Sequence, residues 1–346
     1  MSVLIDLAEG RYVPDVLVRA GIRRLVEMRL KEEHDGDPQV REERYQRLLA
    51  ELATSPIALA TEQANAQHYE VPAEFFRLVL GRHLKYSSAC WDGGAASLDD
   101  AEQRMLALYA ERAQLADGQR VLDLGCGWGS FSLWAADRYP GSSFTAVSNS
   151  TGQRDYIEAQ AVGRGLHNIR VITADVNDLR LDAEFDRVIS VEMFEHVRNY
   201  TLLLQRIASW LAVDGKLFVH IFCHRNLLYP FEADGDANWM ARYFFTGGLM
   251  PAADTLLFFQ EDLQIERRWS LSGSNYQKTA RAWLDNLDRH GNAVTEALQP
   301  AYGEAEVGRW VQRWRMFFMA CEEMFGYRDG SEWLVCHYLF YKRRAG

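Results

Sequence analysis

The 346-residue chain has no long uninterrupted apolar run, no CxxC pair and no excess of positive charge. A bilayer span needs about 18 or more consecutive apolar residues, so no transmembrane segment is expected. The five cysteines are scattered and odd in number, and they predict neither a disulfide framework nor a metal site. The first residues also lack the basic segment and apolar stretch of a signal peptide. These absences together predict a reduced, cytoplasmic protein.

The charge balance and the aromatic content indicate the kind of partner. Lysine and arginine number 38 against 48 aspartates and glutamates, which gives a formal net charge of −10. Nucleic-acid binding requires clustered positive charge, so it is not expected, and anionic membranes are also disfavoured. Aromatic residues make up 12% of the chain. That richness favours a roomy, aromatic-lined pocket for a small molecule.

An alternation of strand-like and helix-like segments defines the middle of the chain. The strand-like runs cover residues 120–124, 143–147, 169–172, 185–191 and 215–222, and the helix-like runs cover 130–139, 152–164 and 200–211. Such alternation is typical of βαβ units. We therefore predict an α/β fold with a doubly wound sheet, completed by a final antiparallel strand over 332–341.

Helical patterns flank this core on both sides. Apolar residues at helical spacing predict helices within 12–65, over 99–112, and about 278–290 and 303–325, with a strand over 263–270. The predicted division is an N-terminal helical cover (1–115), a Rossmann-like core (116–222), a lid insertion that includes one core strand (223–330) and a closing strand (331–346).

The strongest single signal is a glycine-rich turn after the first predicted strand. The segment Asp123-Leu-Gly-Cys-Gly-Trp-Gly129 reads D-x-G-x-G-x-G, and Ser130 can cap the helix that follows. Glycines let the backbone approach a ligand closely, and a helix start presents free N–H groups. A dinucleotide loop would read GxGxxG and would be followed by an acid on the next strand, which ends at Asn149 instead. A ligand-free turn is the alternative interpretation.

Three segments together resemble a known family. The glycine turn is similar to motif I of class I S-adenosylmethionine (SAM)-dependent methyltransferases. Glu192-Met-Phe-Glu-His196 and Arg242-Tyr-Phe-Phe-Thr-Gly-Gly248 resemble the cyclopropane-fatty-acid synthase-like group of that class, and within it the coclaurine N-methyltransferase branch. The resemblance covers nearly the whole chain. It implies a SAM enzyme that methylates the nitrogen of a small aromatic or heterocyclic amine.

The cofactor positions follow from the motif and from the resemblance. Asp123 is placed to hold the amino-acid moiety, Asp175 to accept from the adenine amino group, and Val176 to cover the adenine ring. Amide groups after the second strand can replace the usual acid at the ribose, and residues near position 86 would touch the SAM carboxylate. The predicted cofactor-binding set is Tyr86, Ser87, Asp123, Gly125, Gly127, Asn149, Gln153, Asp175 and Val176.

The resemblance implies that Glu192, Glu195 and His196 form the catalytic cluster. An alkylamine is mostly ammonium near pH 7 and has to lose a proton before it can accept a methyl group. The two glutamates share one face if a helix begins at Met193. A carboxylate pair would attract the cation, and one carboxylate or His196 would accept its proton. Alternatively, the glutamates only favour a helix N-terminus and His196 bonds locally.

The resemblance leaves a second reaction open, the C-methylation or cyclopropanation of an unsaturated fatty-acyl chain. Cyclopropane synthases use a bicarbonate held by Cys, Glu, His and Tyr; the matching positions are Ser88, Glu195, His220 and Tyr276. Tyr243 and Phe244 are candidate substrate walls, with core packing as the alternative. A non-catalytic SAM-binding module is a third interpretation, which the intact cluster disfavours. We also expect a homodimer.

Overall fold

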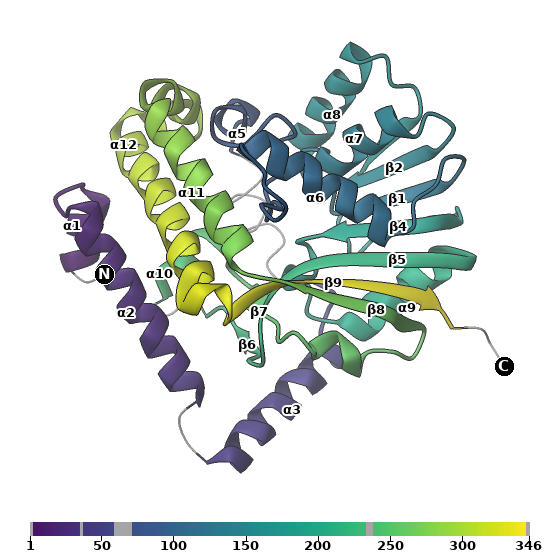
Figure 1. Ribbon diagram of the computed structural model, residues 1–346, viewed down its shortest axis with the longest axis horizontal. Helices are drawn as coiled ribbons and strands as arrows, with labels where there is room; N and C mark the ends of the chain where they lie inside the picture. The colour runs from purple at the N-terminus through teal and green to yellow at the C-terminus, as the bar shows by residue number, and fades with distance from the viewer. Residues whose placement is uncertain (1–2, 35–36, 59–70, 233–237, 344–346) are drawn as a thin grey trace.

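The computed structural model describes residues 3–34, 37–58, 71–232 and 238–343 (Figure 1). Its centre is a seven-stranded sheet in the order β3-β2-β1-β4-β5-β9-β8, in which β9 runs antiparallel to both of its neighbours. The strands are β1 (Arg120–Leu124), β2 (Ser143–Ser148), β3 (Ile169–Thr173), β4 (Phe185–Val191), β5 (Leu211–His224), β8 (Leu263–Leu271) and β9 (Trp333–Lys342). The predicted α/β architecture with a final antiparallel strand is confirmed.

Helices cover both faces of this sheet because its central strands are apolar on both sides. Val121, Leu122 and Leu124 of β1 are all buried, as expected for a strand between two parallel neighbours. The crossover helices are α7 (Ser130–Arg138), α8 (Thr151–Gly163) and α9 (Tyr200–Trp210). Ser150 caps α8 by accepting from the Gln153 N–H, and Asn199 caps α9 in the same way.

The remaining helices lie before the sheet and in the segment inserted after β5. They are α1 (Val3–Glu9), α2 (Asp15–His34), α3 (Pro38–Thr54), α5 (Ala73–Val79), α6 (Leu98–Arg112), α10 (Trp239–Phe244), α11 (Ser274–Arg289) and α12 (Gly291–Gly326). A kink at Gly303 divides α12, and β6 (Tyr229–Pro230) pairs with β7 (Leu249–Met250). The predicted helical region 12–65 consists of α2 and α3, and its last residues lie outside the described ones.

The N-terminal helices pack on the inserted segment. In Figure 1, α2 runs alongside α12, although about 300 positions separate them in the sequence. Arg19 donates to Glu322 and Glu323 at 2.7 Å, and Arg315 donates to Asp15 at 2.6 Å. Helices α1, α2 and α12 therefore form one layer, which ion pairs link.

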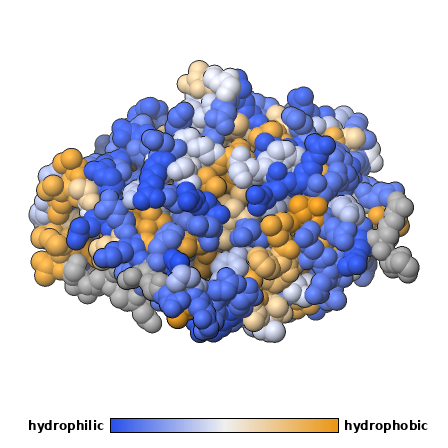
Figure 2. Space-filling view, turned by 60° about the horizontal axis from the view of Figure 1, so that its bottom comes forward, coloured by the Kyte–Doolittle hydropathy of each residue, from blue (hydrophilic) through white to orange (hydrophobic). Residues whose placement is uncertain are grey.

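Apolar side chains remain exposed at the outer end of this layer. Val3, Leu4, Val16 and Leu17 are more than half exposed. Figure 2 shows apolar residues gathered at the end of the molecule where α1 lies. Within the described part of the chain, no helix combines the length and the apolar character that crossing a membrane requires.

The helix expected to begin at Met193 is not formed. Phe194–His196 makes a single 3-10 turn, and α9 starts only at Tyr200. Tertiary contacts compete with the helix: Val197 forms an isolated bridge with Ala58, and the Arg198 N–H donates to the Ile57 carbonyl. Local spacing could not show this, because the competing strand segment lies about 140 positions away in the chain.

Candidate active site

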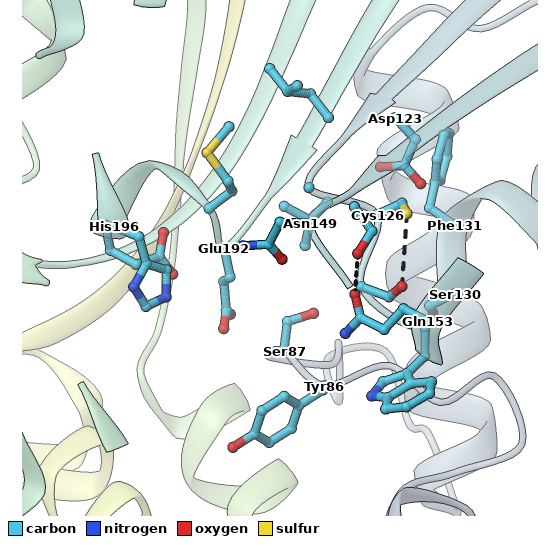
Figure 3. Close-up of a pocket in the computed structure, with 18 of the residues that line it drawn as sticks. Tyr86, Ser87, Asp123, Cys126, Ser130, Phe131, Asn149, Gln153, Glu192 and His196 are labelled. Carbon is cyan, nitrogen blue, oxygen red and sulfur yellow. Dashed lines mark hydrogen bonds between the residues drawn. The ribbon is translucent and has the colours of Figure 1, made fainter. Parts of the chain in front are cut away.

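A cavity lies at the carboxyl ends of the parallel strands, where ligands bind in open α/β sheets. Two groups of residues face each other across it (Figure 3). The glycine-loop side comprises Asp123, Gly125, Gly127, Asn149, Gln153, Asp175 and Val176, and the glutamate side comprises Glu192, Glu195, His196, Phe245 and Tyr276. Tyr86 and Ser87 also line the cavity. The structure thus brings together all nine predicted cofactor positions and all three predicted catalytic residues.

The glycine loop brings bare backbone to the cavity. Gly125 and Gly127 have φ angles of 82° and 52°, in the left-handed region that favours glycine. A Cβ on Gly127 would meet no atom of the described residues within 4 Å, and Gly127 lines the cavity, so a side chain there would project into it. A Cβ on Gly125 would instead lie 2.8 Å from Cγ of Met193. Gly127 is therefore the position where a ligand can approach the chain, whereas Gly125 is needed for packing.

Polar groups on the glycine-loop side are held by hydrogen bonds. The buried Asp123 carboxylate accepts from the Ser132 hydroxyl at 2.6 Å, and burial raises the pKa of Asp123 to about 6. The Ser148 hydroxyl donates to Oε1 of Gln153 at 2.6 Å. This bond orients the Gln153 amide so that its nitrogen faces the cavity (Figure 3). Oδ1 of Asp175 accepts from the Asn177 N–H at 2.7 Å.

Glu192 is the most heavily bonded carboxylate in the cavity. Its Oε1 accepts from the Ser88 N–H and from Nε2 of His220, both at 3.0 Å, and its Oε2 accepts from the Tyr276 hydroxyl at 2.7 Å. The residue follows β4 directly and has a φ of 47°, a conformation that few non-glycine residues adopt. Burial raises the pKa of Glu192 to about 7, although the nearby Lys85 charge lowers it.

Glu195 is the opposite case. Its carboxylate is 1% exposed and lines the cavity, yet neither oxygen has a hydrogen-bond partner among the described residues. Burial, and then the charge of Glu192, raise the pKa of Glu195 well above its usual range. His196 lies next to it in the chain, and its ring stacks on Phe245 with centroids 5.5 Å apart. A buried carboxylate without a partner is expected to take one from a ligand.

The four residues that match the bicarbonate site lie in one region of the structure, but they do not all line the cavity. Ser88 donates only its backbone N–H to Glu192, because its hydroxyl donates to the Ala89 carbonyl at 3.3 Å. His220 is fully buried behind Glu192 and does not line the cavity. Tyr276 lines it but also donates to Glu192. Ser88, His220 and Tyr276 therefore all donate to the Glu192 carboxylate, whereas Glu195 has no hydrogen-bond partner among the described residues.

The two proposed substrate walls of α10 do not line the cavity. Phe244 is fully buried and stacks on Phe317 at 4.3 Å, while the guanidinium of Arg313 lies 4.2 Å from the Tyr243 ring centroid. The lid wall is formed instead by Phe245, Trp283 and Phe317. Helical spacing in the sequence could not show which aromatic residues face the cavity.

Lys85 is a functional candidate that the sequence interpretation missed. The residue is 2% exposed, and its ammonium group donates to the Ser87 hydroxyl at 2.5 Å and to the Ser88 carbonyl at 2.6 Å. It lines the cavity. Burial lowers the pKa of Lys85 to about 8, while the charges of Glu192 and Glu102 raise it. No pattern distinguished this lysine from a surface residue; its only signal was its place directly before Tyr86 and Ser87.

Comparison with known proteins agrees with this geometry. The family model described as mycolic acid cyclopropane synthetase matches residues 59–333. The chain belongs to this family. The (S)-coclaurine N-methyltransferase of Thalictrum flavum subsp. glaucum is 39% identical over 296 residues, which are 84% of this chain and 82% of that protein. The Papaver somniferum enzyme of the same name is 37% identical over 337 residues, 96% of this chain and 95% of its own.

A solved structure in the family is similar over nearly its full length. The crystal structure of a coclaurine N-methyltransferase, bound to N-methylheliamine and S-adenosylhomocysteine (SAH), has a TM-score of 0.94 and 36% identity, and the match covers 98% of this chain and 99% of that one. The chain is a SAM-dependent methyltransferase, which sets the non-catalytic interpretation aside. The cavity suits SAM: Gly127 leaves room beside the backbone, and carboxylate and amide groups line the same side.

Proposed function

We propose that this methyltransferase methylates the nitrogen of a small aromatic or heterocyclic amine. The observation that carries the proposal is the pair of buried carboxylates, Glu192 and Glu195, in the wall of a cavity whose lid is aromatic. Buried negative charge suits an ammonium substrate, and aromatic walls suit both its ring and its positive charge. An alkene needs neither carboxylate for binding. The names of the similar N-methyltransferases also support an amine acceptor.

The two carboxylates take different roles in this proposal. When bound, SAM supplies the methyl group of its sulfonium, which becomes a neutral thioether as the new nitrogen–carbon bond forms. Glu192, held by three donors, acts as the fixed anion that attracts and orients the ammonium. Glu195, with no partner among the described residues and a raised pKa, accepts the ammonium proton and later releases it to solvent. His196 contributes to the wall beside Phe245.

On the opposite side of the cavity, we assign SAM binding to the nine predicted positions and add Lys85. The Asp123 carboxylate and the oriented Gln153 amide supply an acceptor and a donor, and Gly127 permits close approach of the backbone. The Lys85 ammonium orients Ser87 toward the same region. The aromatic residues and the lid exclude water, which favours a displacement between a neutral nitrogen and a sulfonium.

Cyclopropanation remains the second candidate, because the family model is described as a cyclopropane synthetase and Glu195, His220 and Tyr276 match its bicarbonate positions. The hydrogen bonds argue against it. The donors that would hold a bicarbonate, the Ser88 N–H, His220 and Tyr276, already donate to Glu192. A built-in carboxylate thus satisfies the donors that an added anion would need.

The test offers the purified enzyme labelled SAM together with cyclic amines, phenethylamines and unsaturated phospholipids, with and without bicarbonate. We expect label on a soluble secondary amine, at a rate that bicarbonate removal leaves unchanged. If only the phospholipid accepts label, and bicarbonate-free buffer abolishes that turnover, the cyclopropanation candidate replaces the amine proposal.

The remaining expectations concern location and assembly. All five cysteines are free thiols, which fits the predicted cytoplasmic location. The exposed apolar side chains of α1 and α2 fit the predicted homodimer, because such patches mark interfaces. Size-exclusion chromatography with light scattering tests the homodimer, and a monomer at micromolar concentration would contradict it.

A further inference from the structure

A row of hydrogen-bonded side chains leads from Glu192 across the sheet to helix α6. Nε2 of His220 lies 3.0 Å from Oε1 of Glu192, and Nδ1 of His220 lies 2.9 Å from Nε2 of His337. Nδ1 of His337 in turn lies 2.7 Å from Nη1 of Arg112. His220 and His337 are direct cross-strand partners in β5 and β9, so the sheet register itself brings the two rings together.

Arg112 determines in which direction the hydrogen bonds of this row are donated. A guanidinium can only donate, so Nδ1 of His337 has to accept. Both histidines are neutral, because full burial lowers their pKa values well below the usual range. The single ring proton of His337 is therefore on Nε2 and is donated to Nδ1 of His220. The ring proton of His220 is then on Nε2 and is donated to Glu192.

Protonation of Glu192 on Oε1 is incompatible with this row. A proton on Oε1 would have to be donated to Nε2 of His220, which would place the His220 proton on Nδ1. That proton would face the Nε2–H of His337. The His337 proton cannot move to Nδ1, because Arg112 donates to that nitrogen. Tyr109, 2.8 Å from Nδ1 of His220, does not decide the matter, because a phenol hydroxyl can both donate and accept.

The outer end of the row is anchored by packing. The Arg112 guanidinium lies 4.9 Å from the ring centroid of Trp269, and Trp269 is the cross-strand partner of His337 in β8. We infer that Arg112 and His337 are positioning residues that fix the ring proton of His220 on Nε2, where it is donated to Oε1 of Glu192 and favours the ionised form of that carboxyl. This inference rests on the proposed role of Glu192 in binding an ammonium substrate.

Other groups also face Glu192 and have to be separated from this effect. Lys85 favours its charged form, and Glu195 opposes it. The Tyr276, Tyr109 and Cys321 side chains are neutral neighbours whose pKa values are raised. Removing Arg112 takes away a distant positive charge and also the donor that makes Nδ1 of His337 an acceptor. A variant that keeps the charge is therefore needed.

The experiment compares Arg112→Met with His337→Phe, which retains the Arg112 charge, and with the matched control Arg104→Met on the exposed face of α6. We expect the first two variants to move the acid limb of kcat/KM for a secondary amine up by about one pH unit, a loss of about tenfold below that limb. Activity at high pH and SAH affinity should stay near wild type, and the double variant should show no larger shift. Arg104→Met should shift nothing.

The ring proton itself is observable in the intact protein by NMR after labelling histidine with nitrogen-15. His220 and His337 should both carry their proton on Nε2 in wild type, and His220 should shift toward Nδ1 at low pH in Arg112→Met. A proton on Nδ1 of His220 in wild type, or an unchanged acid limb in both variants, would overturn the inference. Because this readout requires no substrate, it is independent of whether an amine is the acceptor. If no amine accepts the methyl group while the histidine tautomers are as expected, the proposed function is wrong and the inference about the ring protons stands.

Discussion

The two sides of the cavity differ in how far apart in the sequence their parts lie. The glycine-loop side is built from three strand ends within residues 123–176. The glutamate side depends on distant partners: Ser88, His220 and Tyr276 are 104, 28 and 84 positions from the Glu192 carboxylate that they hold. A local motif can therefore predict the first side, whereas tertiary packing decides the electrostatics of the second. Substitutions on the two sides should accordingly fail in different ways.

The largest effect is expected on the glutamate side, from Glu195→Gln. Removing the proton acceptor should lower turnover by about 10²–10⁴-fold, while SAH binding, measured by calorimetry, stays at the wild-type level. The loss should shrink at high pH, where more of the amine is already neutral. Glu111→Gln, on the surface of α6, is the control that changes charge without touching the cavity. An equal loss at every pH would indicate packing damage and contradict the role of Glu195.

The corresponding change on the glycine-loop side is Gly127→Val. A side chain at this position would enter the cavity, so SAH affinity should fall by at least about tenfold. A tenfold loss of affinity corresponds to a loss of about 1.4 kcal/mol in binding free energy. Gly165→Val is a matched control: Gly165 also has a positive φ, 66°, and open space around its Cβ position, but it does not line the cavity. Both variants should lose about 1–2 kcal/mol of stability through backbone strain. Normal SAH binding by Gly127→Val would remove the loop from the site.

An intermediate effect is expected for Glu192→Gln, which keeps the shape of the side chain but removes its charge. In wild type, kcat/KM for an amine should rise with pH through about 7, because Glu192 ionises near that pH and only the charged form attracts an ammonium. The variant should lose about 10–100-fold in kcat/KM, mainly through KM, and this limb of the profile should disappear. A limb that persists in the variant would belong to another group.

The smallest effect concerns the lid wall. Phe245→Ala should raise KM for an aromatic amine several-fold, since aromatic contacts contribute about 0.5–1.5 kcal/mol, and should leave a small aliphatic amine nearly unaffected. Phe244→Ala is the comparison: this neighbour is fully buried away from the cavity, so it should lower the melting temperature more than it changes substrate selectivity. Equal selectivity changes in both variants would mean that the lid responds as a single packed unit.

The elements that the sequence predicted well are those whose signal is local. Strand β4 and helix α6 match their predicted ranges within a residue, because apolar runs and helical periodicity mark them directly. The helix expected at Met193 did not form, because residues 57–58 pair with residues 197–198 instead. Lys85 was missed for the same reason: its burial depends on residues that only the folded chain brings together.

The sequence by itself determined the class of fold and the glycine loop, because residue type and spacing carry these features. Its resemblance to the family predicted Glu192, Glu195 and His196 as the catalytic cluster. The tertiary structure alone decided that the Glu192 carboxyl accepts three hydrogen bonds, whereas the described residues give the Glu195 carboxyl none. It also decided that Phe245, and not Phe244, forms the cavity wall. The physical reason is that a carboxylate's pKa and partners depend on burial and on donors from other strands and helices, which no spacing along one chain segment encodes.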